Sequence, residues 1–170
     1  MIVLLIVSIL LVALYVGAAI WKERELPDSI SSLVYLLPDG KWRWLWTVWI
    51  WAATYTLTPA LFELMPESLG AVAHAFATSM LFTGAMPLVK RESNRTHNIL
   101  AISAGVFSQM CVVIICPWWL LLWTLMVILF LLAMKENGLP QWINQKGLFV
   151  TEIVCWLALF GALFTHILKQ

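Results

Sequence analysis

Long apolar runs, separated by short clusters of lysine and arginine, constrain this chain more than any other feature. A helix needs about 20 apolar residues to cross the hydrocarbon core of a bilayer, and the run from Met1 to Trp21 already has this length. Only 11% of all residues are charged, whereas soluble proteins have about 25%. A soluble domain of 170 residues could not bury so much apolar surface. The sequence therefore predicts an all-α fold, a polytopic membrane helical bundle.

Six transmembrane helices are predicted in a single domain that covers residues 1–170. Their ranges are 1–21, 44–64, 69–89, 98–116, 118–134 and 148–168. The apolar stretch from Asn98 to Met134 is too long for one crossing. Pro117 divides it, because proline disfavours continued helix and the tryptophans that follow favour the membrane interface. The first run has no basic residue before it, so we expect it to be retained as a span and not cleaved as a signal peptide.

The basic residues predict the orientation. They follow the first, third and fifth spans, and of the ten Lys and Arg residues only Lys169 falls on the other side. By the positive-inside rule the basic side is cytoplasmic, which places both termini outside. We expect a bacterial inner membrane, because the chain is compact and has no long tails. The residues on the cytoplasmic side are Lys22, Arg24, Lys41, Arg43, Lys90, Arg91, Arg95, Lys135 and Lys146.

The segment between Pro27 and Pro38 is predicted to be more than a connection. Its residues 28–37 contain three serines followed by a mostly apolar run, and Asp28 is of a type that caps helix N-termini. We expect a short helix over about 28–37 that rests at the cytoplasmic interface or enters the bundle.

Two ionisable residues in or near the predicted spans are candidates for function, because charged groups are costly in hydrocarbon. Glu152 lies about one turn inside the cytoplasmic end of the last span, and His97 lies at the start of the fourth span on the same side. Glu152 must be protonated, hydrated or paired across helices. Both a role in binding a substrate or proton and a role in a structural pair fit the pattern. Partners at the right depth are His97, Arg91, Arg95 and Lys146.

The start of the fourth span allows two interpretations. His97, Ala101, Ala104 and Ser108 fall on one helical face, with Gly105 and Gln109 close by. This face is either a wall of a binding site with His97 at its inner mouth, or a seam of small residues through which two helices approach closely.

Three short segments carry a resemblance to a known group: Leu26–Ser31, Gly84–Pro87 and His97–Ala104. Together they resemble the DRAM-like six-helix membrane proteins and related bacterial families of unknown function. In those proteins a Pro/Ser segment follows the first helix, and a histidine with small residues opens the fourth. The resemblance covers roughly residues 20–110. It implies that Ser29, Ser31 and His97 converge on the cytoplasmic side, and it implies no particular activity.

Three functions are compatible with these features. The first is a non-enzymatic module that binds or moves a lipid or small amphiphile, as a homo-oligomer or within a membrane complex. The second is a structural or regulatory subunit that docks a cytoplasmic partner through its basic loops. The third is a membrane-embedded lipid hydrolase. The hypothetical binding residues on the cytoplasmic side are Asp28, Ser29, Ser31, His97 and Glu152.

Several functions are not predicted. The sequence contains no glycine-rich phosphate loop, no His-Glu-x-x-His, no Gly-x-Ser-x-Gly and no set of cysteines spaced for a metal. We therefore predict no catalytic residue, metal or cofactor. A net charge of +1 and the apolar composition also predict membrane lipids and not nucleic acid as the partner.

Overall fold

The computed structural model describes residues 1–24, 26–37, 42–88, 94–137 and 141–169, and within these ranges the regular structure is entirely helical. Each of its α-helices overlaps one of the predicted ranges. They are α1 (Ile2–Glu23), α2 (Trp44–Leu64), α3 (Gly70–Ala85), α4 (Asn94–Ile115), α5 (Leu121–Asn137) and α6 (Gln141–Ile167). Short 3-10 helices lie between them: η1 (Ser31–Leu36), η2 (Glu67–Leu69), η3 (Met86–Leu88) and η4 (Pro117–Leu120).

Within the described ranges, four helical segments are long and apolar enough to cross a membrane, which indicates a membrane protein. They are Ile2–Lys22, Glu67–Leu88, Arg95–Ile115 and Lys146–Ile167. Helix α2 is also 21 residues long, but it is not one of these segments, because its tryptophans and threonines lower its mean hydropathy. Helix α5 is shorter, at 17 residues. Whether α2 and α5 also cross the membrane stays a prediction.

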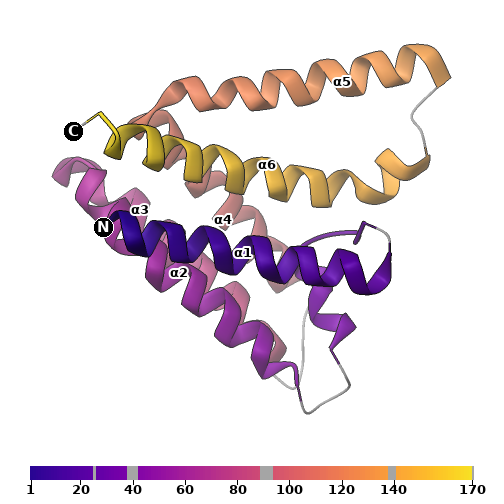
Figure 1. Ribbon diagram of the computed structural model, residues 1–170, viewed down its shortest axis with the longest axis horizontal. Helices are drawn as coiled ribbons and strands as arrows, with labels where there is room; N and C mark the ends of the chain where they lie inside the picture. The colour runs from indigo at the N-terminus through magenta and orange to yellow at the C-terminus, as the bar shows by residue number, and fades with distance from the viewer. Residues whose placement is uncertain (25, 38–41, 89–93, 138–140, 170) are drawn as a thin grey trace.

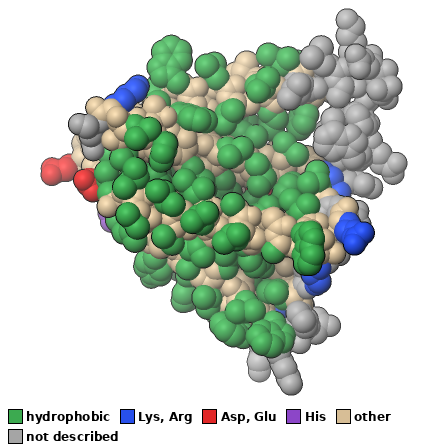
Figure 2. Space-filling view, viewed as in Figure 1, with side chains coloured by type: hydrophobic (Ala, Val, Ile, Leu, Met, Phe, Trp, Pro, Cys, Tyr) green, Lys and Arg blue, Asp and Glu red, His purple; other side chains and the backbone are tan. Residues whose placement is uncertain are grey.

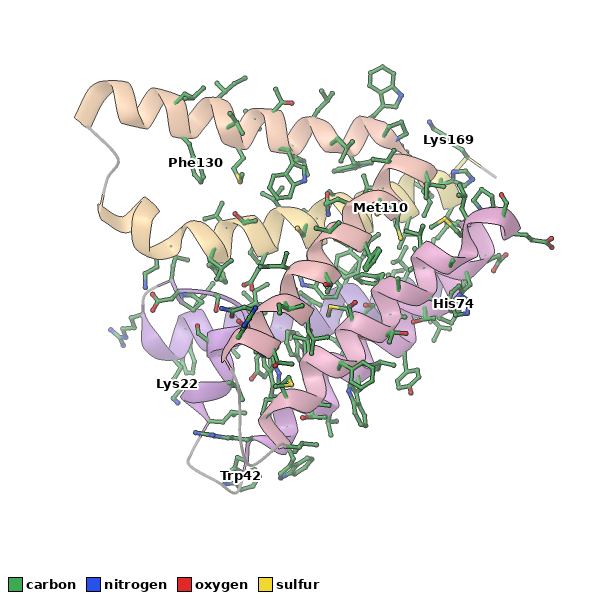
Figure 3. The ribbon with its side chains drawn as sticks, turned by 180° about the vertical axis from the view of Figure 1, so that it is seen from behind. Lys22, Trp42, His74, Met110, Phe130 and Lys169 are labelled. Carbon is green, nitrogen blue, oxygen red and sulfur yellow. The ribbon has the colours of Figure 1, made fainter. Side chains whose placement is uncertain are left out.

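The two ends of the bundle carry different segments of the chain. Both chain termini lie at the same end, and the C-terminal end of α1 and the N-terminal end of α2 lie at the other (Figure 1). Seen from behind, His74 and Lys169 lie at the first end and Lys22 and Trp42 at the second (Figure 3). Hydrophobic side chains cover most of the face between them (Figure 2). This arrangement is the one expected when an apolar middle faces lipid and polar ends face water.

Helices α1, α2 and α3 are joined by hydrogen bonds from side chains of one helix to backbone carbonyls of the next. Ser8 Oγ donates to Ala53 O (2.8 Å), Trp49 Nε1 to Leu11 O (2.8 Å) and Thr47 Oγ1 to Gly84 O (2.6 Å). Polar side chains hold membrane helices together in this way where burial of apolar surface provides little driving force.

Gly84 allows α2 and α3 to approach closely. A Cβ built at this position would lie 2.7 Å from Ile50 Cγ2 and 3.1 Å from Trp51 Cδ1. Any larger residue would therefore push the two helices apart. This close approach helps to bury Ile50 and Trp46, which lies one turn before Ile50 on α2.

The chain breaks between α4 and α5 where proline and the paired tryptophans indicated. Helix α4 ends at Ile115, Cys116 is extended with ψ 86°, and η4 begins at Pro117. Trp119 of η4 lies against α6: its Nε1 donates to Thr165 Oγ1 (3.0 Å), and a Cβ at Gly161 would lie 2.5 Å from its ring. From this anchor α5 runs beside α6 but diverges from it (Figure 1).

Some boundaries differ from the predicted ones. Helix α4 begins at Asn94, so His97 lies within its first turn and not at its start. Helix α6 begins at Gln141, seven residues ahead of the predicted span at 148, because polar residues such as Gln141 and Lys146 can continue a helix beyond the apolar run. Lys41, Lys90 and Arg91 lie outside the described residues, as does the side chain of Lys135.

Candidate functional site

The segment Asp28–Ile30 is docked along the first half of α6. Lys146 Nζ lies 2.5 Å from Asp28 Oδ1, the Phe149 N–H donates to the Asp28 carbonyl (3.2 Å), and the Ile30 N–H donates to Glu152 Oε2. The three residues of α6 are spaced three apart, so they are neighbours on the helix surface. The segment after α1 is thereby attached to the last helix of the chain.

Ser29 and Ser32 form a local turn that begins η1. Ser29 Oγ accepts from the Ser32 N–H (2.9 Å), and Ser32 Oγ donates to the Ser29 carbonyl (2.7 Å). Ser29 Oγ also lies 3.0 Å from Ser31 Oγ. The expected helix at 28–37 is thus a shorter 3-10 helix. Ser29 Oγ satisfies the Ser32 N–H in its first turn, and Asp28 instead turns outward to Lys146.

Glu152 has a partner that the sequence did not suggest. The proposed partners were basic side chains, but Lys146 pairs with Asp28, and the Glu152 carboxylate accepts from the backbone N–H of Ile30. Ile30 is buried, so its N–H needs this acceptor as much as the carboxylate needs a donor. A backbone amide serves here because η1 enters the bundle beside α6.

A groove of about 630 Å³ lies between α4, α5 and α6. Most of its wall is apolar, and polar side chains gather toward the end at which α4 begins. The apolar residues include Ile102, Val106, Met110, Val113, Trp123 and Leu148, and the polar ones are Ser31, Asn98, Gln109, Thr151 and Glu152. Its volume lies in the range of about 300–1,000 Å³ that is usual for small-molecule sites. In Figure 3, Met110 lies in the C-terminal half of α4, and Phe130 points from α5 toward α6.

Gln109 joins the three helices that form the groove. Its Nε2 donates to Ser108 Oγ (2.9 Å) and to Cys155 O of α6 (3.3 Å), and its Oε1 accepts from Trp123 Nε1 of α5 (2.8 Å). Sequence reasoning placed Gln109 near the polar face of α4 but missed Trp123. A glutamine in an apolar helix is the signal that could have indicated an interhelical contact.

A smaller inner pocket of about 80 Å³ lies behind the groove, between η1, α2, α3, α4 and α6. Trp46, Phe76, Met80, Thr83, Ala104 and Ser108 contribute to its wall. Five residues line both spaces: Ser31, Ala101, Gly105, Glu152 and Cys155. Glu152 therefore lies where the groove and the inner pocket adjoin.

The structure places the predicted site residues in three different settings. Ser31 and Glu152 line both spaces. Asp28 and Ser29 lie next to them but take part in the ion pair and the serine turn. His97 is half-buried in the first turn of α4 and is not among the residues that line either space, whereas its neighbour Asn98 lines the groove.

The small-residue face of α4 borders the inner pocket, and both of its interpretations, binding wall and packing seam, stay predictions. Ala101, Ala104 and Ser108 all line the inner pocket, together with Gly105. Within the described ranges no three His, Cys, Asp or Glu side chains come together in a group that could hold a metal ion. The cysteines are free: Cys111 and Cys116 are buried, and Cys155 is half-buried beside the groove.

No family model matches this chain, and neither the curated proteins nor the solved structures include a significant match. The resemblance to the DRAM-like group therefore stays a prediction.

Proposed function

We propose that this protein is a non-enzymatic module of the inner membrane, with six membrane-crossing helices, that binds one acyl chain of a lipid or a single-chain amphiphile. The observation that carries the proposal is the groove between α4, α5 and α6, which is apolar along most of its length and polar at one end. Both termini would face outward, and the basic ends of the helices would face the cytoplasm. Figure 1 shows both termini at the same end of the bundle, which supports an even number of crossings.

The length of the groove suits one acyl chain. Its wall on α4 runs from Asn98 to Val113, which corresponds to roughly 22 Å at a rise of about 1.5 Å per residue. One leaflet of a bilayer accounts for about half of a hydrocarbon core of about 30 Å. A chain from the leaflet next to the polar end would thus fit within the groove.

The wall of the groove is also open toward lipid. Ile102, Val106, Val113 and Leu148 are each more than half exposed, although they are large and apolar. In a bilayer such side chains face hydrocarbon, so an acyl chain can enter from the side without crossing a polar barrier. At the polar end Asn98, Thr151 and Glu152 offer hydrogen bonds to a head group.

A photoreactive lipid tests this proposal. The protein would be reconstituted into nanodiscs that contain a phospholipid with a diazirine on one acyl chain, irradiated and digested for mass spectrometry. We expect adducts concentrated on the groove residues of α4 and α6. A bulky substitution, Val106→Trp, should lower the labelling of these residues several-fold by filling the groove.

Val48→Trp is the matched control. Val48 is 51% exposed and Val106 is 54% exposed, but Val48 lies on α2 and does not line the groove. Equal labelling of the two variants, or adducts spread evenly around the bundle, would contradict the proposal. So would efficient disulfide cross-linking of a Val106→Cys variant into dimers with no lipid label, because a second copy would then cover the groove.

A cytoplasmic partner is the second candidate. Lys22, Arg24 and Arg43 flank the connection between α1 and α2, and Arg95 and Lys146 begin their spans near the same end. Such a cluster of cations suits an acidic protein surface or anionic lipid. If this is the main role, Arg24→Ala with Arg95→Ala would release a stoichiometric partner from the purified complex, and Lys169→Ala at the opposite end would not.

The hydrogen bonds of Asp28 and Ser29 favour a non-enzymatic role over a lipid hydrolase. Ser29 is buried, and its hydroxyl takes part in the turn that begins η1. Asp28 is exposed and pairs with Lys146. A serine nucleophile needs a base within hydrogen-bond reach and an open path to substrate, and a buried turn residue suits the start of a helix better.

A further inference from the structure

The indole N–H of Trp46 is a buried donor beside the inner pocket that has no acceptor among the described residues. Trp46 is 1% exposed, and its ring forms part of the pocket wall. Among the residues that the structure describes, its Nε1 has no hydrogen-bond acceptor. The neighbouring tryptophans do have one: Trp49 Nε1 donates to Leu11 O, and Trp51 Nε1 donates to Leu81 O. A buried N–H without an acceptor is unfavourable, so this position calls for an acceptor that is not a protein group.

The other polar groups around the pocket mainly accept hydrogen bonds. Thr83 Oγ1 donates its proton to Ser79 O (2.8 Å), and Ser108 Oγ donates its proton to Gly105 O (2.7 Å). Thr83 Oγ1 keeps both lone pairs, and Ser108 Oγ keeps one beside the bond that it accepts from Gln109 Nε2. The Glu152 carboxylate adds further acceptor capacity. The wall thus contains the unsatisfied donor Trp46 Nε1 together with several acceptors.

Only an occupant that both accepts and donates matches this wall. An acyl chain would leave the Trp46 N–H without a partner. A phosphate or carboxylate would face Glu152 and the lone pairs of the hydroxyls. Water accepts one bond from the indole and donates two to the acceptors, and a volume of about 80 Å³ has room for about two or three molecules at about 30 Å³ each in the liquid.

We propose that the inner pocket is an internal water site, in which ordered waters bridge the Trp46 N–H to Glu152 and to the hydroxyls of Thr83 and Ser108. Glu152 then receives hydrogen bonds from the Ile30 N–H on one side and from water inside the bundle on the other. This water keeps a carboxyl group hydrated within an apolar helix. The proposal does not depend on what occupies the groove, and it holds or fails separately from lipid binding.

Hydroxyl-radical footprinting in nanodiscs tests for this water, because X-rays generate radicals from water molecules at the place where they are bound. Met80 is the reporter: it lines the pocket and is 8% exposed. Met65 is the internal control: it is 6% exposed, lines neither space and lies at the C-terminal end of α2. We expect Met80 to be oxidised at least about fivefold faster than Met65, since a dry pocket provides no source of radicals.

Two variants remove the water in different ways. Ala104→Leu fills the pocket, and Thr83→Val removes one of its hydroxyls at nearly constant shape. Both should reduce the oxidation of Met80 toward the rate of Met65, while the rate at Met65 and the helical circular dichroism stay unchanged. If Ala104→Leu does not fold, the Thr83→Val variant and the wild-type ratio still decide the result.

Two outcomes would overturn the proposal. The first is oxidation of Met80 no faster than that of Met65 in the wild-type protein. The second is fast oxidation of Met80 that neither variant reduces, because the radicals would then come from bulk water and not from the pocket.

Discussion

At the scale of single residues, Glu152 has a structural contact with Ile30 and also lines both the groove and the inner pocket. Its carboxylate accepts from the Ile30 N–H, so Glu152→Leu should leave a buried amide without an acceptor and lower the free energy of unfolding by about 1–3 kcal/mol. Glu152→Gln keeps a carbonyl oxygen there and should have a much smaller effect. Thermal unfolding in detergent measures both. If the leucine variant is as stable as the glutamine variant, the Ile30 contact contributes nothing.

The ion pair of Asp28 and Lys146 should contribute little. Asp28 is 73% exposed, and pairs of this kind stabilise proteins by about 0–1 kcal/mol. We therefore expect Asp28→Asn to change the free energy of unfolding by no more than about 1 kcal/mol. A double-mutant cycle with Lys146→Met gives the coupling energy. A coupling well above this range would show that the pair, and not the Glu152 contact, holds the segment to α6.

Part of the site could be predicted at this scale. Glu152 is conspicuous as an acid in an apolar run, and Ser31 follows from the serine-rich segment. The partner of Glu152 could not be predicted, because a backbone amide 122 residues away has no sequence signal. For the same reason nothing in the sequence marks Trp46, among eleven tryptophans, as the one whose buried N–H has no acceptor among the described residues.

At the scale of helices, Gly161 sets the position of α5. A Cβ there would lie 2.5 Å from the Trp119 ring, so Gly161→Ala should displace η4 from α6 and lower the free energy of unfolding by about 1–3 kcal/mol. It should also change lipid labelling in the groove, because α5 follows η4. Thermal unfolding and the photolabelling experiment measure the two effects.

Gly17→Ala is the control for this prediction. Gly17 lies in the interior of α1, and a Cβ there would meet nothing within 4 Å. Because alanine favours helix over glycine by up to about 1 kcal/mol, this variant should be as stable as the wild type or more stable. Equal destabilisation by both substitutions would mean that glycine at 161 is not needed for the contact with Trp119.

Helix positions were largely predictable, and the packing of the helices was not. Apolar length and Pro117 locate α4 and α5 because both act locally along the chain. Helix α5, which borders the groove, follows η4, whose Trp119 fits closely against Gly161 of α6. That fit joins residues far apart in sequence, so no periodicity reveals it.

At the scale of the whole molecule, the proposed topology predicts which ends are accessible from each side. Glu67→Cys and Lys169→Cys, at the end of the termini, should react with a membrane-impermeant thiol reagent in intact cells. Arg95→Cys should react only after permeabilisation. The background should be low, because Cys111 and Cys116 are buried and Cys155 is half-buried. Labelling of Glu67→Cys and Arg95→Cys from the same side would rule out a crossing by α3.

The sequence by itself predicted an all-helical chain with spans apolar enough for a membrane, and it predicted which end carries most of the basic residues. Apolar runs need lipid or a core, and ten Lys and Arg residues in so apolar a chain can lie only where water reaches them. Only the tertiary structure decided the sites. The groove and the inner pocket exist because η1 packs against α6, α5 diverges from α6, and Gln109, Glu152 and Trp46 come from different helices. The local composition of a segment determines whether it faces lipid or water, but a cavity depends on how segments distant in sequence pack together.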